Sequence, residues 1–184
     1  MIAGIAGLVA GAMSMATGEY VSVSSQRDAE DADIAREKLE QATSPETEVD
    51  ELANIYVRRG LSSELARTVA IKLMKKDSLG SHLRDELGIS ETTRARPVQA
   101  ALVSAISFAL GAFLPLLVMV FSPAEARIGA TACAALVLLA VLGAVGGRLG
   151  GAPPLRAGLR VTVGGGLAMA LTALIGHWVG SMGG

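Results

Sequence analysis

A run of carboxylates on one predicted helix carries the clearest chemical signal in this chain. Four acidic residues recur at spacings of three and four: Glu30, Asp33, Glu37 and Glu40. On a helix these positions share one face, where like charges destabilise the helix by roughly 0.2–0.5 kcal/mol per pair. Arg36 and Lys38 are expected to point elsewhere. A stripe that opposes its own helix predicts a cation that the sequence does not supply.

A second predicted helix, over residues 45–59, directs acidic groups toward its apolar side. Ser44 and Pro45 read as its N-cap and first residue. At helical periodicity Glu48 and Glu51 fall on the face of its apolar residues, which marks the buried side. We therefore expect both carboxylates to point inward.

Residues 77–88 are predicted to form another helix, with Asp77 or Ser78 as its N-cap. His82 and Glu86 are four residues apart and share a face with leucines. Three helices thus turn acidic or imidazole groups toward one interior. Buried carboxylates are costly unless they are paired or bind metal, so we favour a metal site. The alternative is pairing with nearby basic residues: Arg58, Arg59, Arg67, Lys72, Lys75 and Lys76.

Carboxylates with one imidazole suit Fe²⁺, Mn²⁺ or Zn²⁺, whereas oxygen alone suits Mg²⁺ or Ca²⁺. The chain has no EF-hand loop. It also lacks the Glu-x-x-His pairs of a di-iron oxidase. No catalytic residues, organic cofactor or nucleic-acid partner are expected, and the chain is not predicted to be an enzyme.

The elements that carry these groups are helical, and four stretches are apolar enough to cross a bilayer. These stretches are residues 1–23, 98–121, 128–147 and 161–182. Most charged residues, 12 of 16 Lys and Arg and 15 of 17 Asp and Glu, lie between the first and second of these stretches, at 23–96. The predicted fold is an all-α membrane protein with four transmembrane helices and a helical metal-binding bundle inserted between the first and second. The predicted domains are residues 1–25, 26–92 and 97–184.

Basic residues in the loops indicate the orientation. The short loop 148–160 carries Arg148, Arg156 and Arg160, and Arg27, Arg94 and Arg96 flank the charged insert. The positive-inside rule places both in the cytoplasm of a multi-pass cell-membrane protein.

Within the first apolar stretch, Met15 and Glu19 lie four residues apart on one face. An intramembrane carboxylate marks an ion or proton path by default. A thioether beside it favours a transition ion over Mg²⁺. We predict that these two residues line a translocation path.

The run at residues 10–28, AGAMSMATGEYVSVSSQRD, resembles the second transmembrane helix of the vacuolar iron transporter family. Residues 85–89, DELGI, resemble the end of that family's cytoplasmic metal-binding domain. The resemblance covers the whole chain. It implies a homodimer in the lipid bilayer that exchanges Fe²⁺, often also Mn²⁺, for protons.

By this resemblance the family's glutamate ligands correspond to Glu37, Glu40, Glu48, Glu51 and Glu86. A methionine pair of better-studied relatives is replaced by His82 and Leu83, and imidazole can serve as the ligand. Met15 matches the family's methionine within the membrane.

Family members have five spans, and this chain begins inside the second. Either its start was assigned too late or it has four spans. Proton-coupled metal export, which the resemblance implies, is the first hypothesis. A membrane-anchored iron or manganese buffer or sensor is the second. A divalent channel or Mg²⁺ transporter with an acidic gate is a weaker third, because Met15 counts against it.

Overall fold

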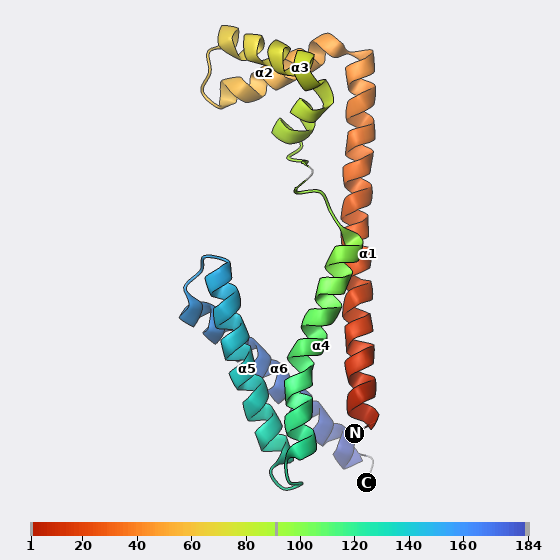
Figure 1. Cartoon of the computed structure of the whole chain (residues 1–184), viewed down its shortest axis with the longest axis vertical. Helices are drawn as coiled ribbons and strands as arrows, with labels where there is room; N and C mark the ends of the chain where they lie inside the picture. The colour runs from red at the N-terminus through yellow and green to blue at the C-terminus, as the bar shows by residue number, and fades with distance from the viewer. Residues whose placement is uncertain (1, 91, 183–184) are drawn as a thin grey trace. The chain divides into compact units, whose positions relative to one another are not determined.

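The computed structural model describes residues 2–90 and 92–182, and Figure 1 shows their course. Within these residues the regular structure is entirely helical. The helices are α1 (Ile2–Thr43), α2 (Pro45–Arg58), α3 (Ser63–Asp85), α4 (Pro97–Phe121), α5 (Arg127–Leu149) and α6 (Pro154–Met182). The predicted all-α class is confirmed.

Four of these helices are long and apolar enough to cross a membrane: α1, α4, α5 and α6. The most apolar stretches of α4 and α5 have mean hydropathies of 2.3 and 2.5, and none of their residues is buried. Apolar side chains left outside a protein core need another apolar environment, which the bilayer supplies. The predicted four spans are confirmed. α1 has 42 residues, about 63 Å of helix, which is twice the thickness of a hydrocarbon core.

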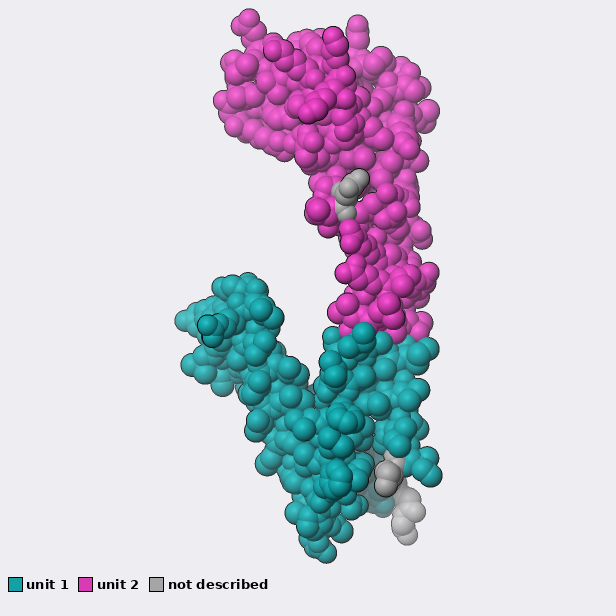
Figure 2. All heavy atoms as spheres, viewed as in Figure 1, with its two compact units in different colours: residues 1–14, 105–184 teal, residues 15–104 magenta. Residues whose placement is uncertain are grey.

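The chain divides into two compact units, coloured separately in Figure 2. Unit 1 contains residues 1–14 and 105–184, and unit 2 contains residues 15–104. In unit 1, α5 and α6 pack closely where Gly143 and Gly158 meet, since a Cβ on Gly143 would lie 3.0 Å from the Gly158 Cα. The predicted domain boundaries at residues 25 and 97 stay predictions.

In unit 2, α2 and α3 form a helical hairpin. The chain turns at Gly60, whose φ of 101° suits a residue without a side chain. Ser62 caps α3 by accepting a hydrogen bond from the Leu65 amide. The core between the two helices is small and made of five buried residues: Leu52, Ala53, Ile55, Ala66 and Ala70. The two alanines of α3 let the helices approach closely.

α3 is broken at Asp77, whose φ and ψ of −160° and 89° are not helical. The Asp77 carboxylate accepts a hydrogen bond from the Gly80 amide at 3.0 Å, which is the geometry of an N-cap. The predicted helix start at Asp77 is therefore confirmed. The break makes residues 78–85 a separate helical segment, and this segment carries His82.

Candidate metal centre

Three side chains from three helices of unit 2 converge in its interior. Glu37 comes from α1, Glu48 from α2 and His82 from the last segment of α3. Their exposed fractions are 3%, 3% and 0%. One potential ligand atom from each lies within 4.8 Å of those of the other two. Buried ionisable groups in such contact are typical of a metal site.

The His82 Nδ1 atom is the focus of this cluster. It lies 3.2 Å from Glu37 Oε1 and 3.7 Å from Glu48 Oε2. Donors that hold one ion at about 2.0–2.2 Å are separated by roughly 3.0–3.5 Å in tetrahedral or octahedral geometry. The observed separations therefore match a cation held by these atoms after only small side-chain shifts.

Glu86 adds a fourth group on the same ring nitrogen. Its Oε2 lies 2.9 Å from His82 Nδ1, one helical turn away. An ionised carboxylate only accepts hydrogen bonds, so Nδ1 carries the proton when Glu86 is charged. A metal ion bound at Nδ1 would displace that proton and leave the Glu86 carboxylate within reach of the ion.

Two atoms of the centre lack a hydrogen-bond partner in the described part of the chain. They are Glu48 Oε2 and His82 Nε2, and both are buried. Buried polar atoms without partners are uncommon and require an explanation. A cation supplies one for the Glu48 oxygen.

Basic side chains do not neutralise the three glutamates. The ion pairs that Glu37, Glu48 and Glu86 make among the described residues are all with His82. The arginines expected to compete pair elsewhere, Arg59 with Asp85 and Arg67 with Asp50. The alternative of a centre closed by basic residues is therefore not supported for these groups.

Burial, followed by the negative charge of Glu37, raises the pKa of Glu48 to about 7. The partial positive character of His82 acts in the opposite direction, and Glu51 adds a smaller increase. Without metal, Glu48 is thus half protonated near neutral pH. A divalent cation would replace the proton and favour the charged carboxylate.

This pKa shift predicts how the stability of the metal-free protein depends on pH. In the folded state Glu48 titrates near 7, against 4.5 for an unperturbed glutamate. Between these values the folded state binds more protons, so the Glu48 contribution to the free energy of unfolding falls as pH rises from about 4.5 to about 7. Glu48→Gln removes this contribution. Thermal unfolding in detergent with a chelator should show the variant gaining stability relative to wild type across this range. A difference that is constant with pH would contradict the assignment.

Of the other predicted ligands, Glu40 and Glu51 are exposed. The expectation that Glu51 points inward is wrong for this single chain. Glu48, Leu52 and Ile55 form the buried stripe of α2. Glu51 precedes Leu52 and is rotated by about 100° from it, so it lies at the edge of the stripe. The assignment of Glu40 and Glu51 as metal ligands stays a prediction.

The acidic stripe on α1 is also less uniform than expected. Arg36 does not point elsewhere but pairs with Asp33, three residues earlier. Glu30 accepts a hydrogen bond from the Ala95 amide at 3.0 Å. Of the four stripe carboxylates only Glu37 enters the cluster, because Glu30 and Asp33 have other partners and Glu40 is exposed.

Gln41 is a contributor that the sequence reasoning missed. Its Nε2 donates a hydrogen bond to Glu37 Oε1 at 2.7 Å, which orients that carboxylate. Side chains that hold metal ligands in place affect affinity nearly as much as some ligands do. Gln41 lies four residues after Glu37, and this helical spacing was the feature of the sequence that could have indicated the contact.

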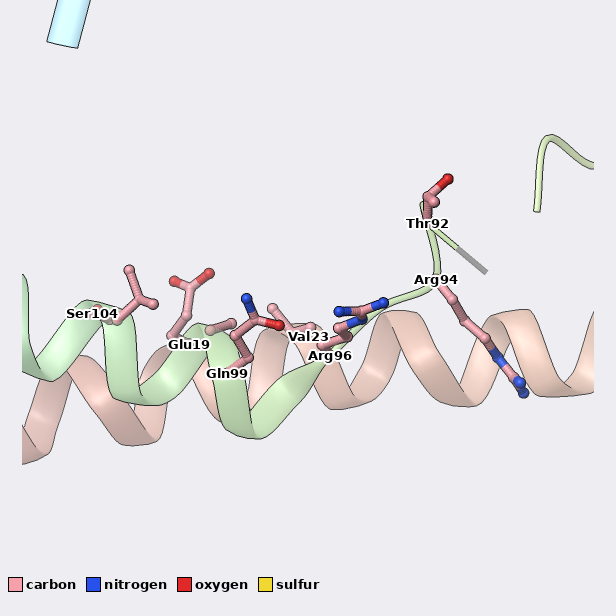
Figure 3. A pocket seen from close by; sticks show the side chains of 9 residues that line it. Glu19, Val23, Thr92, Arg94, Arg96, Gln99 and Ser104 are labelled. Carbon is pink, nitrogen blue, oxygen red and sulfur yellow. The ribbon is translucent and has the colours of Figure 1, made fainter. Parts of the chain in front are cut away.

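The predicted path residues Met15 and Glu19 lie on α1 and are both exposed in this chain. Glu19 lines a pocket of about 490 Å³ between α1 and the start of α4. Gln99 and Ser104 line the same pocket, and Figure 3 labels them together with Glu19. Met15 is not among the residues that line this pocket. Its role in translocation stays a prediction.

Comparisons with known proteins show the family to which the chain is similar. The VIT family matches residues 1–177. A vacuolar iron transporter of Acanthamoeba castellanii is 48% identical over 177 residues, which are 96% of this chain and 68% of that protein. Vacuolar iron transporter homolog 2 of Oryza sativa is 37% identical, over 94% of this chain and 69% of its own length. Vacuolar iron transporter 1 of Arabidopsis thaliana is 33% identical, over 92% of this chain and 69% of its own length.

Proposed function

Because this chain belongs to the VIT family, we propose that it exports Fe²⁺ from the cytosol in exchange for protons, after collecting the ion at the centre formed by Glu37, Glu48 and His82. Members of the family are transporters rather than enzymes. The observation that carries the proposal is the convergence of three buried ligands from three helices. The resemblance inferred from residues 10–28 is confirmed by the family match.

The ligand set supports the choice of ion. Carboxylate oxygens with one imidazole suit Fe²⁺ and Mn²⁺, and Zn²⁺ also accepts them. Relatives are named as iron transporters, which favours iron as the cargo. Mn²⁺ is the second ion we expect the centre to accept.

Translocation is assigned to the α1 face that carries Met15 and Glu19. Glu19 is the acidic residue of the apolar first part of α1, and intramembrane carboxylates mark ion and proton paths. The pocket that Glu19 lines has further polar groups, among them Gln99 and Ser104. A carboxylate at this position can bind either a proton or a cation, which gives a route to proton exchange.

Orientation and assembly complete the proposal. The positive-inside rule places Arg148, Arg156 and Arg160 in the cytosol together with the metal-binding domain, residues 26–92. The protein then acts in a cell membrane as a homodimer, with the cytosolic glutamates raising the ion concentration near the path.

Transport can be tested directly with purified protein in liposomes. Fe²⁺ added under anaerobic conditions to the side of the membrane that carries residues 26–92 should enter the liposomes. A pH indicator should record protons moving the opposite way. Metal binding without any metal flux would contradict transport. It would favour the alternative of a membrane-anchored metal buffer or sensor, which needs the centre but no path.

A further inference from the structure

Asp85 lies at the end of α3, immediately before Glu86, and its side chain is 12% exposed. Its carboxylate accepts three hydrogen bonds: from the Tyr56 hydroxyl at 2.9 Å, from Arg59 at 2.8 Å and from Arg84 at 3.0 Å. Arg59 also donates to the Asp85 carbonyl at 3.2 Å. These bonds tie the end of α3 to Tyr56 and Arg59, which lie at the end of α2.

This network joins the two helices that carry most of the metal ligands. Tyr56 is near the end of α2, two turns beyond Glu48, and packs against the small core. The Arg59 guanidinium lies over its ring, 5.4 Å from the centroid. Asp85 therefore fixes the last turn of α3 to a part of α2 that is itself held by packing and stacking.

The last turn of α3 needs such an anchor. The break at Asp77 disconnects it from the rest of α3, and Gly88 follows with a φ of 68°. The same turn carries His82 and Glu86, and without a cation the Glu86 carboxylate would be repelled by Glu37 and Glu48. Because non-helical backbone bounds this turn on both sides, contacts outside the helix must hold its orientation against that repulsion.

The charge state of Asp85 is consistent with an anchor. Burial by itself would raise its pKa, but the hydrogen bonds from Arg59, Tyr56 and Arg84 outweigh burial and lower the pKa below its usual value. The carboxylate stays ionised, and charge-assisted hydrogen bonds are about twice as strong as neutral ones.

We propose that Asp85 is a positioning residue of the metal centre, which acts through Glu86 and His82 by fixing their turn to α2. It does not touch the ion. This inference rests on the proposed metal-binding function of the centre.

The test is a double-mutant cycle on the full chain in detergent, with Mn²⁺ affinity measured by calorimetry. Asp85→Asn keeps the size of the side chain but weakens its bonds to the arginines, and it should lower the affinity about tenfold. In a Glu86→Gln background the same change should lower the Mn²⁺ affinity by a clearly smaller factor. The Glu86 carboxylate through which Asp85 acts on metal binding is then absent. Equal losses in both backgrounds would overturn the positioning role through Glu86.

Two further variants keep the inference falsifiable. Tyr56→Phe removes a single hydrogen bond and leaves the core packing, so it should lower Mn²⁺ affinity in the same direction by a smaller factor, even if Asp85→Asn fails to fold. Asp50→Asn breaks an exposed pair with Arg67 and should leave the affinity unchanged. If Glu48→Gln abolishes Mn²⁺ binding while Asp85→Asn and Tyr56→Phe bind as wild type does, only the positioning role is wrong. If Glu48→Gln itself binds normally, the proposed centre is wrong.

Discussion

Replacing Glu48 by Gln is expected to lower the affinity for Fe²⁺ and Mn²⁺ by at least about a hundredfold. Changes around a metal site that spare its ligands already cost 10–100-fold, and Glu48 supplies a buried oxygen without any other partner. Gln keeps the volume and the hydrogen-bonding capacity but removes the charge that the ion requires. Calorimetry under anaerobic conditions for Fe²⁺, or in air for Mn²⁺, measures the change.

The same variant separates binding from folding. In metal-free protein at pH 7 the neutral Gln should be no less stable than Glu48, because burial and the charge of Glu37 both oppose ionisation there. Metal should raise the unfolding temperature of the wild type, since a ligand that binds only the folded state stabilises it. The variant should lose this increase.

Glu46→Gln is the matched control, since it removes an exposed acid of the same helix that is not a predicted ligand. Its affinity should stay close to that of the wild type. If both variants bind metal equally well, Glu48 is not a ligand. If only Glu46→Gln loses binding, the centre has been placed on the wrong side of α2.

Replacing Glu19 by Gln is expected to abolish metal-dependent proton flux in liposomes while leaving metal binding at the Glu37–Glu48–His82 centre intact. The variant cannot exchange a proton for a cation, and an amide holds a divalent ion far less well than a carboxylate does. Met15→Ala should also stop the flux by removing the thioether ligand. Flux is recorded with a pH indicator inside the liposomes and binding by calorimetry on the same preparations.

Met13→Ala provides the control for Met15, because Met13 is two residues away on the same exposed helix. It should transport at the wild-type rate. Unchanged flux in both Glu19→Gln and Met15→Ala would remove this path assignment. A parallel loss of binding in Glu19→Gln would instead indicate that the protein is damaged as a whole.

The helices and the centre were predictable from the sequence where the signals are local. The lengths of apolar stretches predicted the four spans, and Ser44, Gly60 and Asp77 marked the breaks between the shorter helices. The apolar stripe of α2 identified Glu48 as buried, because residues at helical spacing share one environment.

Interactions between distant residues were not predictable in the same way. The Asp85 carboxylate meets Tyr56 and Arg59, which are 29 and 26 residues earlier. The Glu30 carboxylate meets the Ala95 amide, 65 residues later. Periodicity reports which face a residue occupies but not which partner it meets there. For this reason the stripe on α1 was expected to act as one unit, whereas the fold assigns its members to different partners.

The central claim is that Glu37, Glu48 and His82 hold a divalent cation, and X-ray diffraction from Mn²⁺-soaked crystals at the manganese edge tests it most directly. We predict an anomalous peak in the interior of unit 2, about 2.0–2.2 Å from His82 Nδ1 and from one oxygen of each glutamate. The peak should vanish in Glu48→Gln crystals. Anomalous signal confined to exposed carboxylates such as Glu40 and Glu51, with the imidazole still bonded to Glu86, would contradict the account.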